Sequence, residues 1–288
     1  MATDTAEHAR MWCVPKLGGL QLLSATFITY AFKRHMHDYF VIGMIEDGLQ
    51  TFSYRGAQHR TPPGGLILLN PVEPHTGEAA TDSGFVYRAM YPEADLLQKI
   101  ASDISERPRD VPFFPTPVVQ DTLLVGEIIA LHKALENAAP TLEQESRFLW
   151  TLGHLILRHA DSRPPVKSIR AERHEVARIR HYLDEHFAED VTLEQLAALV
   201  NWSPFYLLRV FRQEVGLPPH AYLENVRVRR AQDMLLRGLP LAQIAYDTGF
   251  SSQSHLTNSF KRHIAVTPGQ YAQQRNILQD SHTSIDLS

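Results

Sequence analysis

The sequence predicts a two-domain α+β protein, with an antiparallel β-barrel or sandwich first and an all-helical domain last. Three observations support this prediction. Short runs rich in β-branched and aromatic residues fill residues 20–88, and turn residues separate them at short intervals. From residue 93 onward, the apolar residues recur at helical spacing instead. Between the two parts, residues 161–170 are polar and contain prolines, as is typical of a linker.

The composition is that of a globular protein of about two domains. The chain has 288 residues, of which 44% are hydrophobic and 21% are charged. Its only cysteine, Cys13, excludes a disulfide framework or a multi-thiolate zinc site within the chain. No apolar run approaches the roughly 20 residues that cross a bilayer, and residues 1–10 lack the apolar core of a signal peptide. We therefore expect a cytoplasmic protein with no membrane segment.

Strands are expected in the first part, and helices follow them. The strands cover residues 21–32, 37–45, 50–54, 66–69 and 85–90. The first helix covers residues 93–105, and two more follow helical spacing over 123–135 and 142–156, with Thr141 suited to cap the second of this pair. The spacing alone does not separate core packing from a dimerisation surface for this pair.

The helical domain contains a pattern typical of two helices that cross at a fixed angle. Thr192 and Gln195 form a capping box ahead of a short helix over residues 193–200. Asn201 suits the left-handed conformation of a tight turn. Ala197 is small where a second helix must approach closely. This spacing predicts a helix-turn-helix.

The second helix of this unit begins at Ser203 and Pro204, and the whole pattern then recurs. Serine is a favoured cap and proline a favoured first helical residue. Residues 241–245 match residues 193–197 at an offset of 48, and Gly249 takes the turn position. One such match is often only two packed helices, but chance rarely repeats a spacing, so two units are predicted.

The segment between the two units and the local charge both favour contact with DNA. Residues 219–237 can form one helix, and at about 1.5 Å a residue it spans roughly 28 Å. Successive major-groove faces lie roughly 34 Å apart. The whole chain has a net charge of −4, but residues 203–275 carry nine Lys or Arg against four Asp or Glu. A rigid connector could thus hold two recognition helices in adjacent grooves.

At these residues the sequence resembles the AraC/XylS family of transcriptional regulators, most specifically between Arg178 and Tyr271. The motifs are residues 196–197, 203–211, 216–219, 244–245, 249–256, 260–261 and 267–271. The first part also resembles that family's cupin-type effector domain, through residues 35–39, 45–48, 62–64 and 74–75.

The resemblance implies a domain plan and a function. It implies a cupin-like effector-binding and dimerisation domain over residues 1–160, a linker over 161–172, a double helix-turn-helix DNA-binding domain over 173–275, and a disordered tail over 276–288. The expected protein is a transcriptional activator that is modulated by a small-molecule effector. It acts as a homodimer on double-stranded DNA, with RNA polymerase as a partner, and needs no cofactor and no catalytic residue.

The resemblance also places particular side chains on DNA. Base-edge contacts fall to Ser203, Phe205, Tyr206 and Arg209 in the first unit, and to Gln253, His255, Thr257 and Asn258 in the second. Phosphate contacts fall to Arg212, Lys261 and Arg262. The chemistry agrees in part, because Arg209 can bind guanine bidentately and Gln253 or Asn258 can bind adenine. Phe205 and Tyr206 are equally well suited to packing.

Histidines and a tyrosine in the first domain are expected to bind the effector. His35, His37 and Tyr39 share the parity of a strand, so we expect them to face one cavity, which His75 would close at its mouth. Glu46 does not share this parity and is expected at the rim.

The same histidines leave two other functions open. A cupin metal site has a His-x-His pair, an acid several residues later and a further histidine, but Val41 or Ile42 stands where the acid belongs. Three imidazoles alone can bind a divalent metal. We favour ligand-pocket or structural histidines, with no metal. The alternatives are a metal-dependent cupin enzyme with an attached DNA-binding module, and a ligand-independent DNA-binding protein with a purely structural barrel.

Overall fold

The computed structural model describes residues 7–169 and 172–273, and these form two compact units. The first unit holds residues up to 139 together with 147–168, and the second holds 140–146 and the residues from 169 onward. The predicted tail over 276–288 lies outside the described residues. The exact domain limits given above stay predictions.

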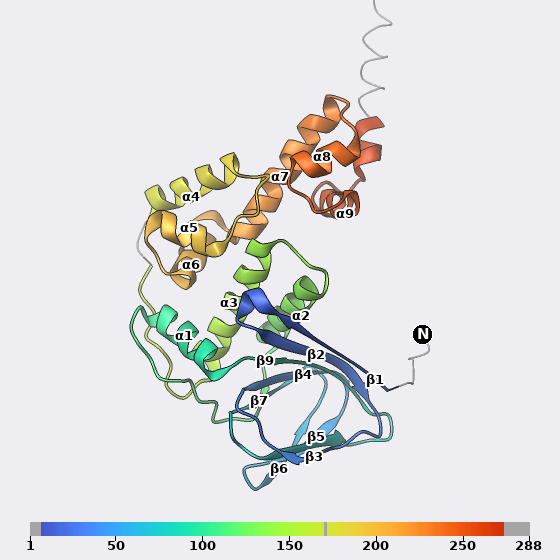
Figure 1. Ribbon diagram of the computed structural model, residues 1–288, viewed down its shortest axis with the longest axis vertical. Coiled ribbons are helices and arrows are strands. Elements are labelled where there is room, and N and C mark those ends of the chain that lie inside the picture. The colour runs from blue at the N-terminus through green and yellow to red at the C-terminus, as the bar shows by residue number, and fades with distance from the viewer. Residues whose placement is uncertain (1–6, 170–171, 274–288) are drawn as a thin grey trace, which may run out of the picture. The chain divides into compact units, whose positions relative to one another are not determined.

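Two antiparallel sheets form the framework of the first unit, as the sequence predicts (Figure 1). The six-stranded sheet has the order β1 (His8–Val14), β2 (Leu20–Phe27), β9 (Phe85–Tyr91), β4 (Val41–Gly48), β7 (Gly65–Leu69) and β10 (Val118–Gln120). The four-stranded sheet has the order β3 (Phe32–His35), β8 (His75–Ala79), β5 (Gln50–Tyr54) and β6 (Ala57–Thr61).

The apolar residues of both sheets bury one shared core. It includes Leu23 and Tyr87 of the larger sheet and Phe52 and Tyr54 of the smaller one. The packing leaves no room for a side chain at Gly43 in β4, where an added Cβ atom would lie 2.5 Å from the Tyr87 hydroxyl oxygen. Close packing of this kind explains why the apolar runs predict β2, β4, β5, β7 and β9 well.

Three helices complete the first unit: α1 (Ala94–Ser105), α2 (Thr122–Glu136) and α3 (Thr141–His159), whose first residues are grouped with the second unit. Asp121 caps α2, because its carboxylate accepts a hydrogen bond from the backbone N–H of Leu124 at 3.1 Å. The same carboxylate accepts from Arg158 Nε at 2.7 Å and bonds His159 Nε2 at 2.9 Å. Burial acts to raise the pKa of Asp121, but these bonds outweigh it and hold that pKa below its usual value.

The second unit is helical throughout its named elements. They are α4 (Arg173–Glu185), α5 (Leu193–Val200), α6 (Pro204–Val215), α7 (Pro219–Leu236), α8 (Leu241–Asp247) and α9 (Gln253–Ile264) (Figure 1). The later half of this unit has its own core, in which Val228 of α7 meets Ile244 of α8 and Phe260 of α9. Among the described residues, no helix combines the length and the apolar character that crossing a membrane requires.

Candidate functional site

The first helix-turn-helix comprises α5, a tight turn and α6, and its local chemistry is as the sequence predicts. Thr192 Oγ1 accepts from the Gln195 backbone N–H at 3.2 Å, and Gln195 Oε1 accepts from the Thr192 backbone N–H at 2.8 Å. Both halves of the capping box are therefore formed. Asn201 adopts the left-handed conformation with φ 55°. Ser203 Oγ caps α6 by accepting from the Tyr206 backbone N–H at 3.3 Å.

The second helix-turn-helix, α8 and α9, repeats this design with a turn that demands glycine. Gly249 has φ +74°, and a Cβ atom there would lie 2.6 Å from the carbonyl oxygen of Ala188. Ser252 caps α9 by accepting from the His255 backbone N–H at 3.1 Å. The small residue at the helix contact, Ala245, is buried like Ala197 in the first helix-turn-helix. Both turns thus contain a left-handed residue and lead into a helix capped by serine.

Helix α7 joins the two helix-turn-helices, and a buried arginine anchors it. Its 18 residues span about 27 Å at 1.5 Å each. Arg227 is only 5% exposed. Its Nε donates to the Phe187 carbonyl at 2.7 Å and its Nη2 donates to the Glu189 carbonyl at 2.8 Å. No role was predicted for Arg227 from the sequence, where its place between Val226 and Val228 was the available signal.

Exposure separates the residues predicted to contact bases. Gln253 and Asn258 of α9 are exposed, and Arg209 of α6 is half-buried. Ser203 and Thr257 are also half-buried, so they too retain some exposed surface.

Phe205 and Tyr206 are instead only 1% and 3% exposed. The assignment of these two rings to base edges is therefore corrected. Their large apolar area is instead buried away from water, which is energetically favourable for aromatic rings.

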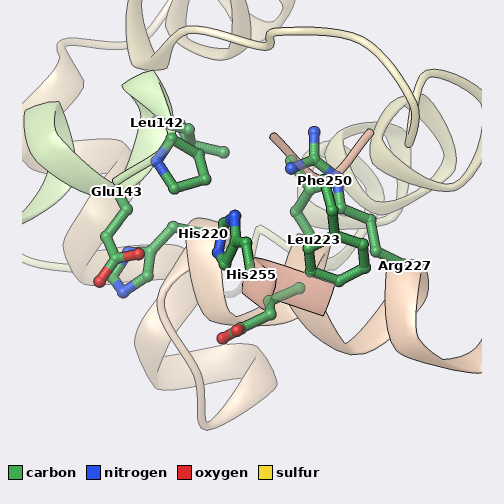
Figure 2. A pocket seen from close by; sticks show the side chains of 9 residues that line it. Leu142, Glu143, His220, Leu223, Arg227, Phe250 and His255 are labelled. Carbon is green, nitrogen blue, oxygen red and sulfur yellow. The ribbon is translucent and has the colours of Figure 1, made fainter. Parts of the chain in front are cut away.

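His255 is partly withdrawn from the surface of α9. It lines a small pocket with His220, Leu223 and Phe250 (Figure 2). Its Nδ1 lies 3.1 Å from Ser251 Oγ. Burial lowers the pKa of His255, so its ring is neutral at neutral pH. A neutral imidazole can donate and accept hydrogen bonds but carries no positive charge.

The residues predicted to contact phosphate are all on the surface. Arg212 and Lys261 are exposed. Arg262 is also exposed, but its Nη2 lies 2.5 Å from the Glu224 carboxylate. Contact of Arg262 with a phosphate would have to replace that ion pair, so Lys261 is better placed than Arg262 for this role.

The first unit brings three predicted histidines together. Ring centroids of His35, His37 and His75 lie 4.5–5.0 Å apart in pairs. His35 ends β3 and His75 begins β8, and the two residues are paired across these strands. His37 follows β3 in the connection to β4, where its carbonyl accepts from the Val72 backbone N–H at 2.7 Å.

A cavity of about 640 Å³ opens beside these rings. His35, His37 and Tyr39 line it, as expected, together with aromatic rings that include Phe27, Tyr30, Phe32 and Tyr91. The reason for the shared orientation differs from the prediction. Strand β4 begins only at Val41, so His37 and Tyr39 do not belong to a strand whose parity could align them.

Two further expectations about this cavity need correction. His75 is buried and lines a smaller space of about 60 Å³ with the same two histidines, so it lies inward rather than at a mouth. Glu46 does not line the cavity, because it pairs with Arg88 Nε at 3.0 Å.

Burial sets the protonation state of the cluster. Burial, followed by the proximity of His75 and His35, lowers the pKa of His37 to about 4. Burial also lowers the pKa of His75. Burial raises the pKa of Tyr39, whose ring stacks on His37 at 4.3 Å. At neutral pH the imidazoles of His37 and His75 and the phenol of Tyr39 are therefore uncharged.

Comparisons with known proteins match both units. A family model described as an AraC-like ligand binding domain matches residues 17–152, and a helix-turn-helix domain model matches residues 196–274. The chain is similar to the HTH-type transcriptional regulator YbfI of Bacillus subtilis, with 34% identity over 229 residues that cover 80% of this chain and 82% of the relative.

The chain is also similar to two further proteins. The HTH-type transcriptional activator RhaS of Klebsiella pneumoniae is 24% identical over 253 residues, which cover 86% of this chain and 90% of that relative. Among solved structures, the C-terminal domain of AraT, a response regulator from Geobacillus stearothermophilus, is 37% identical. That alignment covers 35% of this chain and 85% of the other, with a TM-score of 0.34.

Proposed function

The chain belongs to the AraC family of transcriptional regulators, and from this premise we propose that a small molecule held in the first unit controls how the two helix-turn-helix units engage DNA. The observation that carries the proposal is the rigid connection between the two helix-turn-helices. Both turns are locked by caps and left-handed residues, and α7 joins them as one helix anchored through Arg227. Such a connector suits two recognition helices that enter adjacent major grooves.

We assign base contacts to the exposed or half-exposed residues of α6 and α9. They are Ser203 and Arg209 in α6 and its cap, and Gln253, His255, Thr257 and Asn258 in α9. Arg212 and Lys261 would bind phosphates, and Arg262 would do so after release from Glu224.

The effector would bind in the cavity of the first unit. His35, His37 and Tyr39 supply hydrogen-bonding groups on a mostly aromatic wall, and His75 supports them from the inner side. We propose that the protein activates transcription, and its similarity to the transcriptional activator RhaS supports this. A regulator of this kind needs no catalytic residue, so we do not assign an enzymatic activity.

Dimerisation is proposed through α2 and α3, since Leu123 on α2 is 69% exposed and would be covered by a second copy. RNA polymerase is the proposed partner on DNA, and the cytoplasm is the proposed location.

Selection of genomic DNA by the full chain tests this function. Fragments recovered at low salt should share a site of about two helical turns, and binding should weaken steeply as salt rises because condensed counterions are released. Recovery of no preferred sequence at low salt would contradict the proposal.

A further inference from the structure

We infer that His35, His37 and His75 together hold one divalent transition-metal ion whose free coordination position faces the cavity. The inference rests on the proposed function, because it gives the effector cavity a chemical character. Each histidine offers one ring nitrogen, and these three atoms all lie within 4.8 Å of one another. A point no more than about 2.8 Å from all three therefore exists, and small rotations of the rings reach the Zn–N distance of about 2.0–2.1 Å.

The hydrogen bonds of two rings prepare them as ligands. His35 Nδ1 lies 2.6 Å from the Lys33 carbonyl, and His75 Nδ1 lies 2.9 Å from the Glu73 carbonyl. A carbonyl oxygen only accepts, so each Nδ1 must carry the proton and each Nε2 keeps its lone pair. Metal-binding histidines usually donate their second ring N–H to a carbonyl or carboxylate in this way.

The backbone around the cluster is held firmly. The Glu73 residue that accepts from His75 has its own carboxylate bound by Arg55, with Nη2 2.7 Å away, and by the Tyr54 hydroxyl. The His37 carbonyl accepts from the Val72 backbone N–H at 2.7 Å. Ligands on such fixed segments lose little freedom when an ion binds, which favours a real site over a chance gathering of histidines.

The ligand set indicates which ion and which effector it would take. Imidazoles suit zinc, copper, iron and nickel, and three of them leave at least one position open. Neutral imidazoles do not offset the charge of the ion, so a negatively charged oxygen is the preferred fourth ligand. The cavity beside it is lined by the rings of Phe27, Phe32 and Tyr91. The effector class that fits is a carboxylate carried on an aromatic or apolar body.

Titration of the chelator-treated full chain with Zn²⁺ and with Co²⁺ tests the site. We expect one Zn²⁺ per chain in calorimetry and visible Co²⁺ bands typical of four or five ligands. His37→Gln and His75→Gln should each weaken binding at least ~100-fold, because each removes a ligand. His181→Gln, an exposed histidine on α4, is the matched control and should leave binding unchanged. Thermal unfolding of each variant shows whether it is folded. His37 lies outside the strands, so His37→Gln keeps the test valid if His75→Gln does not fold.

The outcomes separate this inference from the proposed function. Failure to bind Zn²⁺, or equal binding by the wild type and folded His37→Gln, would overturn the metal site, while DNA selection by the same preparations would be unaffected. Stoichiometric Zn²⁺ without DNA selection would refute the proposed function and leave the site standing. Benzoate should shift the Co²⁺ bands of the wild type, and unchanged bands would overturn the open position.

Discussion

Replacement of Arg227 by methionine is the most informative single change to the DNA-binding unit. Methionine keeps most of the apolar stem but removes both donors to the Phe187 and Glu189 carbonyls. A hydrogen bond from a charged donor contributes about 1.5–3 kcal/mol, and the two carbonyls would lose their partner in a buried place. Release of the buried charge offsets part of this loss. We therefore expect the free energy of unfolding to fall by about 2–4 kcal/mol.

The assay compares urea unfolding and DNA binding of Arg227→Met with those of Arg229→Met. Arg229 is exposed on the same helix, so its replacement changes the same charge without breaking the anchor. Arg227→Met should lower stability and weaken binding to a selected duplex beyond the loss in Arg229→Met. Equal losses in both variants would show that the loss of charge matters and the anchoring of α7 does not.

Further changes test the other parts of the account. Arg209→Ala should cost on the order of 1–3 kcal/mol of binding free energy and relax the preference at one base pair, whereas Lys261→Ala should weaken binding to all DNA sequences about equally. The same uniform loss in both variants would contradict the division into base and phosphate contacts. Gly249→Ala should lower the free energy of unfolding by at least about 2 kcal/mol, since both the positive φ and the Ala188 carbonyl oppose a side chain. Gly216 has a positive φ but open space around it, so Gly216→Ala should cost about 1 kcal/mol in thermal unfolding. Equal costs in the two variants would contradict the clash with Ala188. Asp121→Asn should destabilise by about 1–3 kcal/mol at pH 7. Because the folded pKa of Asp121 is lowered, its contribution is present above the unfolded pKa and is lost as pH falls through the folded pKa, so the two proteins should converge in acid, and a gap that persists there would refute the assignment.

Local signals predicted the helical unit closely. The capping box at Thr192, the left-handed turn at Asn201 and the start of α6 at Pro204 depend on neighbouring residues only, so the sequence contains them directly. The spacing of apolar residues likewise predicts α7 to within one residue at each end.

Edge and polar strands were missed for the opposite reason. β1, β6 and β8 carry mainly polar or exposed residues, so no run of β-branched and aromatic residues marks them in the sequence. Such strands have no periodic pattern of apolar residues from which they could be predicted.

Tertiary packing also decides where the predicted site residues lie. Phe205 and Tyr206 belong to a helix whose inner face only the assembled core defines. Strand parity predicted that His35, His37 and Tyr39 face one cavity, and they do line one, but the connection before β4 and the pairing of β3 with β8 bring the histidines together.

Footprinting of the full chain on a selected genomic duplex tests the central claim most directly. If α7 holds two recognition helices in adjacent grooves, hydroxyl-radical cleavage should show, for each bound copy of the chain, two protected segments on one face of the DNA, about 10 base pairs apart. Val228→Pro, which breaks α7 in its middle, should reduce the protection to one segment. A single protected segment with the wild type, or two segments with Val228→Pro, would contradict the account.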